Sequence, residues 1–294
     1  MSARDVFAAL MIALVWGLGF IAMKIGVRDV PPLSLATLRF FLAAFPAVFF
    51  IAPPKAKVSI VFAYGIAIGV MQFGLVFSAI RFGMPASLTS LLMQSQVFWT
   101  ILFAWAAMGE KPGLIQVAGG LVAMSGVLVI ASVRASGATL FPFLLVVAAA
   151  MSWSLGNIIG KFAGRVDMLA FTIWTSLAAI IPLFFVALVV EGPESVATIF
   201  NPGWNSFLSA AFLAWAATLF GYSLWANLLS RYPAAIVAPF SLLVPVVGFV
   251  SSQIAFDEPT SGVEYAGGVL VMAGLAWVVS GEKALARWRA ARGI

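Results

Sequence analysis

Two tryptophans stand at equivalent points of a repeated stretch, and each has a second side chain of note four residues later. Trp16 is followed by Phe20, and Trp153 is followed by Asn157. Residues four apart lie on the same face of a helix. A face that combines aromatic rings with an amide suits the noncovalent binding of a small amphipathic molecule. The alternative is that both tryptophans only fill space in the core.

The residue types that do covalent or metal chemistry are missing where such chemistry would be needed. The chain has no cysteine and no histidine, which excludes thiolate catalysis, disulfides and histidine metal ligands. All acidic residues fall in loops or at the ends of apolar stretches: Asp5, Asp29, Glu110, Asp167, Glu191, Glu194, Asp257, Glu258, Glu264 and Glu282. Proton-coupled carriers of lipophilic cations usually need a carboxylate at mid-depth. We therefore expect no catalytic residue, no metal and no cofactor, and disfavour cation efflux by proton antiport.

The elements that must position these side chains are membrane-spanning helices. Of the 294 residues, 63% are hydrophobic and 9% are charged, with a mean hydropathy of +1.11, which leaves too few charges to cover a soluble globule. Requiring about 20 apolar residues per span, we predict an all-α integral membrane protein of ten helices. They cover residues 6–26, 33–51, 59–80, 85–108, 113–133, 140–161, 168–190, 206–229, 234–256 and 262–281.

The sequence consists of two similar halves, and each half contains five predicted spans. The stretch Trp16–Lys24 is echoed by Trp153–Lys161, and Ala118-Gly119-Gly120 by Ala266-Gly267-Gly268. Two copies with an odd number of spans must insert in opposite directions, as in the inverted repeats of alternating-access carriers, whose site lies at mid-membrane between the halves. We place the N-terminal repeat at 5–135, the C-terminal inverted repeat at 138–282 and a basic cytoplasmic tail at 283–294. Most lysines and arginines fall on the side of the termini, which predicts that both termini are cytoplasmic.

The predicted substrate-binding residues are rings and uncharged polar side chains near the middle of helices 1, 3, 4, 6, 8 and 9. They are Trp16, Phe20, Gln72, Phe73, Phe77, Gln94, Gln96, Trp99, Trp153, Asn157, Tyr222 and Ser241. Gln94, Gln96 and Asn157 could instead only bridge helices. The fifth helix of each repeat carries mostly small and aliphatic residues and is predicted to be scaffold, with its paired glycines allowing close backbone contact.

Three basic residues are predicted to act in gating or charge recognition. Lys24 and Lys161 end the paired stretches, where they either snorkel to headgroups or meet a substrate carboxylate at opposite mouths. Arg39 lies about two turns inside helix 2, where it must reach water or a partner. It could snorkel outward or pin helix 2 to a neighbouring carbonyl. In helix 9, Pro239 and Pro245 predict an interrupted helix, although such prolines are often only packing kinks.

These motifs resemble the drug/metabolite transporter superfamily in its ten-helix EamA branch. The resemblance rests on the Trp-Gly opening of helix 1 that ends in Lys24, Arg39 in helix 2, the Gly109-Glu110-Lys111-Pro112 turn and the doubled Ala-Gly-Gly stretches, and it covers essentially the whole chain. The aromatic lining makes the chain similar to YddG-type aromatic amino acid exporters.

The resemblance implies an exporter in the bacterial inner membrane that moves amino acids or related metabolites by alternating access. Without a titratable group at mid-depth we expect uniport. The expected partners are a small-molecule substrate and membrane lipids, with no nucleic acid, and a monomer is plausible. The alternatives are a broad-specificity drug efflux carrier and a membrane enzyme for lipid-like substrates, which would need a reactive mid-depth group that the sequence does not offer.

Overall fold

The fold is an all-helical bundle of ten spans in the part of the chain that the structure describes. The structure is a computed structural model, and it describes residues 1–109, 111–134, 139–164, 166–232 and 237–292. Eight spans meet the length and hydropathy of a membrane helix, and two further apolar helices, Phe240–Phe256 and Gly262–Val278, are shorter. This confirms the predicted fold class.

The first repeat contains five spans. They are α1 (Ala3–Asp29); α2 (Pro32–Ala44) with the short η1 (Ala47–Phe49); α3, η2 and α4 (Val58–Tyr64, Gly65–Phe73, Gly74–Arg81); α5, η3 and α6 (Ala86–Leu92, Met93–Ser95, Gln96–Met108); and α7 (Leu114–Arg134). The second repeat follows the same plan. Its spans are α8 (Leu140–Lys161); α9 (Met168–Val190), followed by the short α10 (Pro193–Ala197); α11, η5 and α12 (Trp204–Ala211, Phe212–Phe220, Gly221–Arg231); η6 and α14 (Ala238–Leu242, Leu243–Phe256); and α15 (Gly262–Arg292).

The irregular helical turns recur at equivalent places in the two repeats. The third span of each repeat has a nine-residue π-helix at its middle, η2 in the first copy and η5 in the second. The fourth span of each has a 3₁₀ segment, η3 and η6. The interruption of helix 9 was expected from its prolines, whereas the π segments were not. π-helical turns are rare and often mark functional sites, and here the duplication has kept both.

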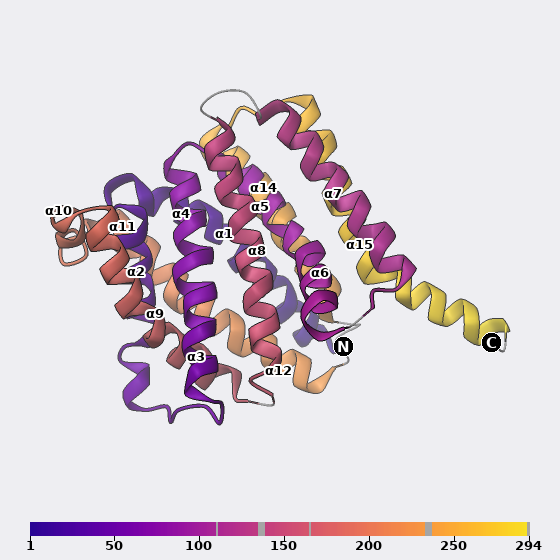
Figure 1. Cartoon of the computed structure of the whole chain (residues 1–294), viewed down its shortest axis with the longest axis horizontal. Coiled ribbons are helices and arrows are strands. Elements are labelled where there is room, and N and C mark those ends of the chain that lie inside the picture. The colour runs from indigo at the N-terminus through magenta and orange to yellow at the C-terminus, as the bar shows by residue number, and fades with distance from the viewer. Residues whose placement is uncertain (110, 135–138, 165, 233–236, 293–294) are drawn as a thin grey trace.

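The repeats pack against each other in reciprocal pairs. Span α1 lies against α14 just as α8 lies against α6, and α2 contacts η5 just as α9 contacts η2. The second spans of the two repeats, α2 and α9, also pack against each other. The first and last spans of the chain begin and end toward the same end of the bundle, with α15 extending beyond it (Figure 1).

The fifth spans α7 and α15 form a separate pair at one side of the bundle (Figure 1). A Cβ added to Gly119 would lie 2.8 Å from the carbonyl oxygen of Gly274, and one added to Gly126 would lie 2.5 Å from that of Gly267. The backbones therefore touch, as predicted for these glycines.

Span α15 continues further than the sequence predicted. The predicted helix stops at residue 281, but the backbone remains helical to Arg292. The added segment is rich in alanine and arginine, both good helix formers. The predicted basic tail 283–294 is thus helical over 283–292, and its last two residues, like the repeat boundary at 135–138, lie outside the described part.

Candidate functional site

A buried cavity lies at the seam between the two repeats. It has a volume of ≈ 120 Å³ and draws its walls from α1, α2, the third and fourth spans of the first repeat, and the second repeat's α8, η5, α12 and α14. Its lining residues are Trp16, Gly19, Phe20, Met23, Arg39, Gln72, Phe73, Val76, Met93, Gln94, Trp153, Leu213, Ala217, Tyr222 and Val244. The two π segments and the first repeat's 3₁₀ segment all border it, so the irregular backbone gathers around this space.

Seven of the twelve predicted substrate-binding residues line the cavity. They are Trp16, Phe20, Gln72, Phe73, Gln94, Trp153 and Tyr222, together with the predicted charge-recognition residue Arg39. Phe77 lies one layer behind, fully buried, with its ring 5.9 Å from that of Phe73. Gln96, Trp99, Asn157 and Ser241 are not among the lining residues. The four remain predictions as substrate contacts.

Trp16 is held rigidly at one wall. Its indole Nε1 donates a hydrogen bond of 2.8 Å to the carbonyl oxygen of Ala217. Its ring lies 5.4 Å from the rings of Tyr222 and Trp225. A Cβ on Gly221 would come within 2.5 Å of Nε1, so glycine is needed there for the indole to fit. The tryptophan therefore presents a fixed aromatic surface to the cavity.

Arg39 places a cation in the same cavity and does not snorkel outward. It is 3% exposed, and its Nη2 donates a hydrogen bond of 2.8 Å to Thr218 Oγ1 in η5. The guanidinium carbon lies 3.6 Å from the centroid of the Phe73 ring and 4.7 Å from that of Phe40. A guanidinium in mid-membrane costs about 2.5–3.5 kcal/mol on insertion scales, and cation–π contacts offset part of that. The arginine pins α2 to a hydroxyl, where the sequence suggested a carbonyl.

Gln96 and Asn157 form a polar bridge between α6 and α8. Asn157 Nδ2 donates to Gln96 Oε1 at 3.0 Å and to Thr100 Oγ1 at 3.1 Å. Ser154 Oγ donates to the Gln96 carbonyl oxygen at 2.7 Å. This is the helix-bridging alternative that the sequence left open. Nearby, Trp99 packs on Phe98 with its buried Nε1 unpaired among the described residues.

Lys24 pairs with Glu258 at the membrane side where α1 ends. Lys24 Nζ lies 2.6 Å from Glu258 Oε1, and the backbone N–H groups of Ala86 and Ser87 each donate to the same carboxylate at 2.8 Å. Glu258 thus caps the first turn of α5, where helix N–H groups lack partners. Burial by itself raises the pKa of the Glu258 carboxyl, but the hydrogen bonds from Lys24, Ser87 and Ala86 outweigh it and lower this pKa overall.

A second carboxylate closes the same side. Glu191, at the end of α9, accepts from the backbone N–H of Leu33 at 2.7 Å and of Ser34 at 3.0 Å. It caps α2 as Glu258 caps α5. Both contacts join one repeat to the other. On the side of the membrane where α1 ends, two carboxylate caps therefore join the second repeat to the first.

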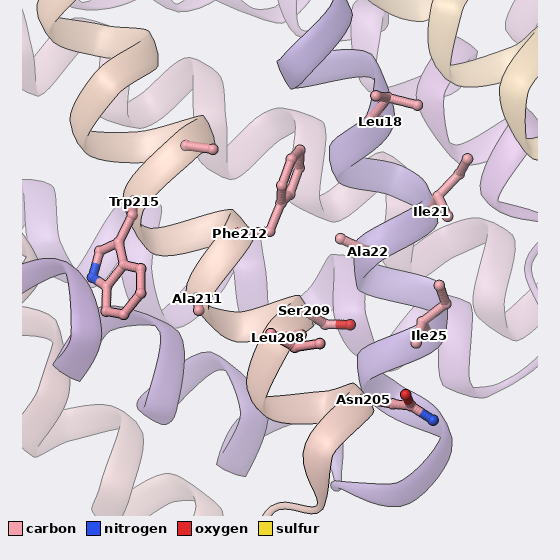
Figure 2. A pocket seen from close by; sticks show the side chains of 11 residues that line it. Leu18, Ile21, Ala22, Ile25, Asn205, Leu208, Ser209, Ala211, Phe212 and Trp215 are labelled. Atoms are coloured by element: carbon pink, nitrogen blue, oxygen red, sulfur yellow. The ribbon is translucent and has the colours of Figure 1, made fainter.

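A wider groove lies outside the bundle, between α1 and the α11–η5 segment (Figure 2). It has a volume of ≈ 670 Å³ and is lined mostly by aliphatic and aromatic side chains such as Leu18, Ile25 and Phe212. Trp215 and Leu208 at its edge are about half exposed. A surface this apolar is one that lipid tails cover, and it offers no buried charge to a polar solute. The cavity at the seam is therefore the candidate site.

Ten apolar spans, an inverted duplication and a cavity at its seam define a carrier that moves small molecules across a membrane. The chain belongs to the EamA-like transporter family, whose model matches twice, at residues 4–132 and 140–280. Each match covers one repeat. The family is one of transporters, so the chain is a multi-pass transport protein and not an enzyme.

The chain is similar to curated proteins along nearly its whole length. It is 41% identical to the "Probable amino-acid metabolite efflux pump" of Escherichia coli K12, covering 99% of this chain and 98% of that protein. The protein of the same name from Salmonella typhimurium LT2 is also 41% identical, with 94% of each chain covered. A solved crystal structure shares the fold with a TM-score of 0.62 at 19% identity, covering 95% of this chain and 98% of the other.

The sequence missed those lining residues that carry no polar or aromatic signature. Met23, Val76, Met93, Leu213 and Val244 line the cavity but look like any other core residue in the sequence. Thr218, which holds Arg39, was visible as a polar residue at mid-depth of helix 8. Its pairing with Arg39 could not be read from the sequence because it depends on how the two repeats meet.

Proposed function

We propose that this transporter exports amino acids with aromatic or apolar side chains, or related small metabolites, from the bacterial cytoplasm across the inner membrane. The observation that carries the proposal is the lining of the cavity, where rings lie beside amides and one cation. Rings such as Trp16 and Trp153 suit an apolar side chain, and Gln72 and Gln94 suit the polar end of an amino acid. The names of the two 41% identical relatives support the same substrate class.

The transport cycle is alternating access by rocking of one repeat against the other. The two carboxylate caps at Glu258 and Glu191 join the repeats on one side, so this conformation is closed there. Opening that side breaks both caps and the Lys24–Glu258 ion pair. Breaking such a pair costs little when both charged groups are released to water at the mouth of the pathway.

The carrier works as a uniporter that runs down the gradient of its substrate. The acidic residues of the chain lie in loops or at span ends, and the described cavity lining contains no carboxylate that could exchange a proton at mid-depth. Export from a cytoplasm rich in amino acids needs no further driving force. Both termini face the cytoplasm in this arrangement, in line with the distribution of lysines and arginines.

Counterflow in proteoliposomes tests the proposal. Vesicles preloaded with unlabelled phenylalanine, tryptophan, methionine or threonine should accumulate the matching labelled amino acid, and an imposed pH gradient should leave the initial rate unchanged. Empty liposomes and vesicles with Trp16→Ala protein serve as controls. If none of the amino acids exchanges, the assigned substrate class is wrong; proton movement in fixed ratio to substrate would exclude uniport.

A broad drug efflux carrier is the second candidate, because much of the lining is apolar and ring-rich. Arg39 argues against it for the many drugs and dyes that are cations, since a like charge in a buried cavity repels them. Resistance of expressing cells to chemically unrelated cationic dyes, lost in a transport-dead variant, would favour this second function.

A further inference from the structure

We propose that Arg39 is the anchor for the substrate's carboxylate, so that the cavity selects small molecules that combine an anionic carboxylate with an apolar body. This inference rests on the proposed function and deepens it, because it names the chemical group that the site recognises. Four features of the site support it: unused donors on Arg39, a missing counter-charge, the asymmetry of the repeats and the chemistry of the surrounding walls.

Arg39 has more donors than it uses. A guanidinium carries five N–H donors, and in Arg39 the Nη2 atom donates to Thr218 Oγ1. Its Nε and Nη1 atoms are buried and have no hydrogen-bond partner among the described residues. Buried donors are normally satisfied, and each exception asks for an explanation such as an absent ligand. Arg39 lines the cavity, so a ligand bound in the cavity can supply the missing acceptors.

Arg39 also lacks a counter-charge. It makes no ion pair with a described residue, and the other described residues that line the cavity carry no charge. Its contacts are a hydroxyl and the rings of Phe73 and Phe40. A buried cation without an anion is unfavourable, and a carboxylate of the substrate would neutralise it with two parallel hydrogen bonds. An arginine matches that forked geometry better than a lysine.

The charge occurs in one repeat only. The equivalent second span of the other repeat, α9, contains no lysine, arginine, aspartate or glutamate. A duplicated scaffold that carries a cation on one side of its cavity binds a ligand in one orientation, with its anionic end toward α2. The aromatic wall of Trp16 and Tyr222, which also line the cavity, then suits the apolar end.

The remaining polar groups around the cavity are neutral. The Gln72 and Gln94 side chains line the cavity and make no hydrogen bond with another described residue. Amide oxygens accept hydrogen bonds from an ammonium group without the strength of an ion pair. The cavity thus holds a charged partner for a carboxylate but only neutral partners for an amine. We expect the carboxylate to contribute more to affinity than the amino group.

Binding of four related ligands to the purified full-length protein tests this order. The ligands are phenylalanine, phenylalaninamide, 3-phenylpropionate and 2-phenylethylamine, measured by thermal shift and by calorimetry in lipid nanodiscs. Charged hydrogen bonds of this kind make the two carboxylates bind about 10- to 100-fold more tightly than the two ligands without one. Equal affinity of the unmodified protein for phenylalanine and its amide would overturn the proposal without any variant being needed.

The variants Arg39→Gln and Arg39→Lys locate the effect at this side chain. Arg39→Gln should reduce the affinity for phenylalanine to about that of the amide, while its affinity for the amide stays the same. Arg39→Lys keeps the positive charge but loses the forked N–H donors of the guanidinium, and it should keep part of the preference for carboxylates. Thr218→Val is the matched control: it removes the protein's own hydrogen bond to Arg39 and must preserve the preference for carboxylates. If Arg39→Gln is not monodisperse, Arg39→Lys and Thr218→Val test the proposal in its place. If both variants lose the preference for carboxylates to the same extent, the role of Arg39 is purely structural.

The same panel separates this inference from the proposed function. Binding of 3-phenylpropionate but of no amino acid would keep the anchor and reject amino acids as substrates. Counterflow of amino acids that is insensitive to Arg39→Gln would keep the function and reject the anchor. Competition of increasing chloride with bound phenylpropionate shows whether the site holds inorganic anions only, and full displacement with no preference for the carboxylates would also reject the proposal.

Discussion

Glu258 illustrates how a single side chain can join three spans. Its carboxylate contacts the Lys24 ammonium of α1 and two backbone N–H groups at the start of α5, and it follows directly on α14. The glutamate is 5% exposed, and its side chain is shielded more than that of Lys24. Charge-assisted hydrogen bonds of this kind are stronger than neutral ones. In the proposed transport cycle this contact must break, so Glu258 would act as a lock as well as a helix cap.

The lock makes stability depend on pH in a defined direction. The pKa of Glu258 is lower in the folded protein than its ordinary value. A carboxylate of this kind stabilises the folded state above its unfolded pKa, and the contribution is lost as the pH falls through the folded pKa. We expect the melting temperature of the protein in nanodiscs to decrease as the pH falls below about 5. Glu258→Gln should lower the free energy of unfolding by about 1–3 kcal/mol at pH 7 and should weaken this decrease of the melting temperature at acidic pH.

Glu194→Gln is the matched control, since Glu194 lies exposed in the short α10. The control should melt as the unmodified protein does at every pH. If the melting temperature of Glu258→Gln decreases at acidic pH as much as that of the unmodified protein, other carboxylates cause the decrease. Faster transport by Glu258→Gln at neutral pH would agree with a lock that must break during the cycle.

At the scale of elements, α1 and α12 approach each other closely beside the cavity. The start of α12 is Gly221, where an added Cβ would meet the Trp16 indole at 2.5 Å. The indole is fixed by its hydrogen bond to Ala217 and cannot rotate away without losing it. Gly221→Ala should therefore push the tryptophan into the cavity and destabilise the protein by about 1–3 kcal/mol, with a clear loss of transport.

Gly160→Ala gives the comparison, because a Cβ there would lie 3.4 Å from Tyr64 in ordinary contact. Alanine is the better helix former, so this variant should be as stable as the unmodified protein or slightly more so. Counterflow rates normalised to monodisperse protein measure both. Equal transport by the two variants would mean that the position of Trp16 is unimportant.

The elements themselves could be predicted far better than their internal irregularities. Eight of the spans begin and end within a few residues of the positions expected from hydropathy, because the bilayer demands a fixed apolar length, and the predicted start of the ninth span lies outside the described residues. The two prolines of the ninth span predicted that its helix is interrupted. The π segments were not predicted, because the residues of η2 and η5 carry no signal that distinguishes them from the rest of an apolar span. In the cavity, Trp16 and Gln72 were found from their depth, whereas Gln96 and Asn157 have the same signature and face each other instead.

At the scale of the whole molecule, the proposed transport cycle requires the side of the membrane that is joined by the two caps to open. The chain has no native cysteine, so an engineered pair is the only site of thiol modification. Cysteines at Lys24 and Glu258, joined by a short bis-thiosulfonate reagent, should abolish counterflow, and a reductant should restore it. The two single-cysteine variants control for the loss of the ion pair. Transport that continues in the crosslinked protein would contradict rocking about this seam.

The glycine-lined contact between α7 and α15 bears on how the polypeptide is assembled during synthesis. Span α7 is synthesised well before α15, its backbone partner in the finished bundle. During that interval the glycines of α7 lack the contact that they have in the folded protein. The packing of the N-terminal repeat therefore depends on a helix that belongs to the other repeat.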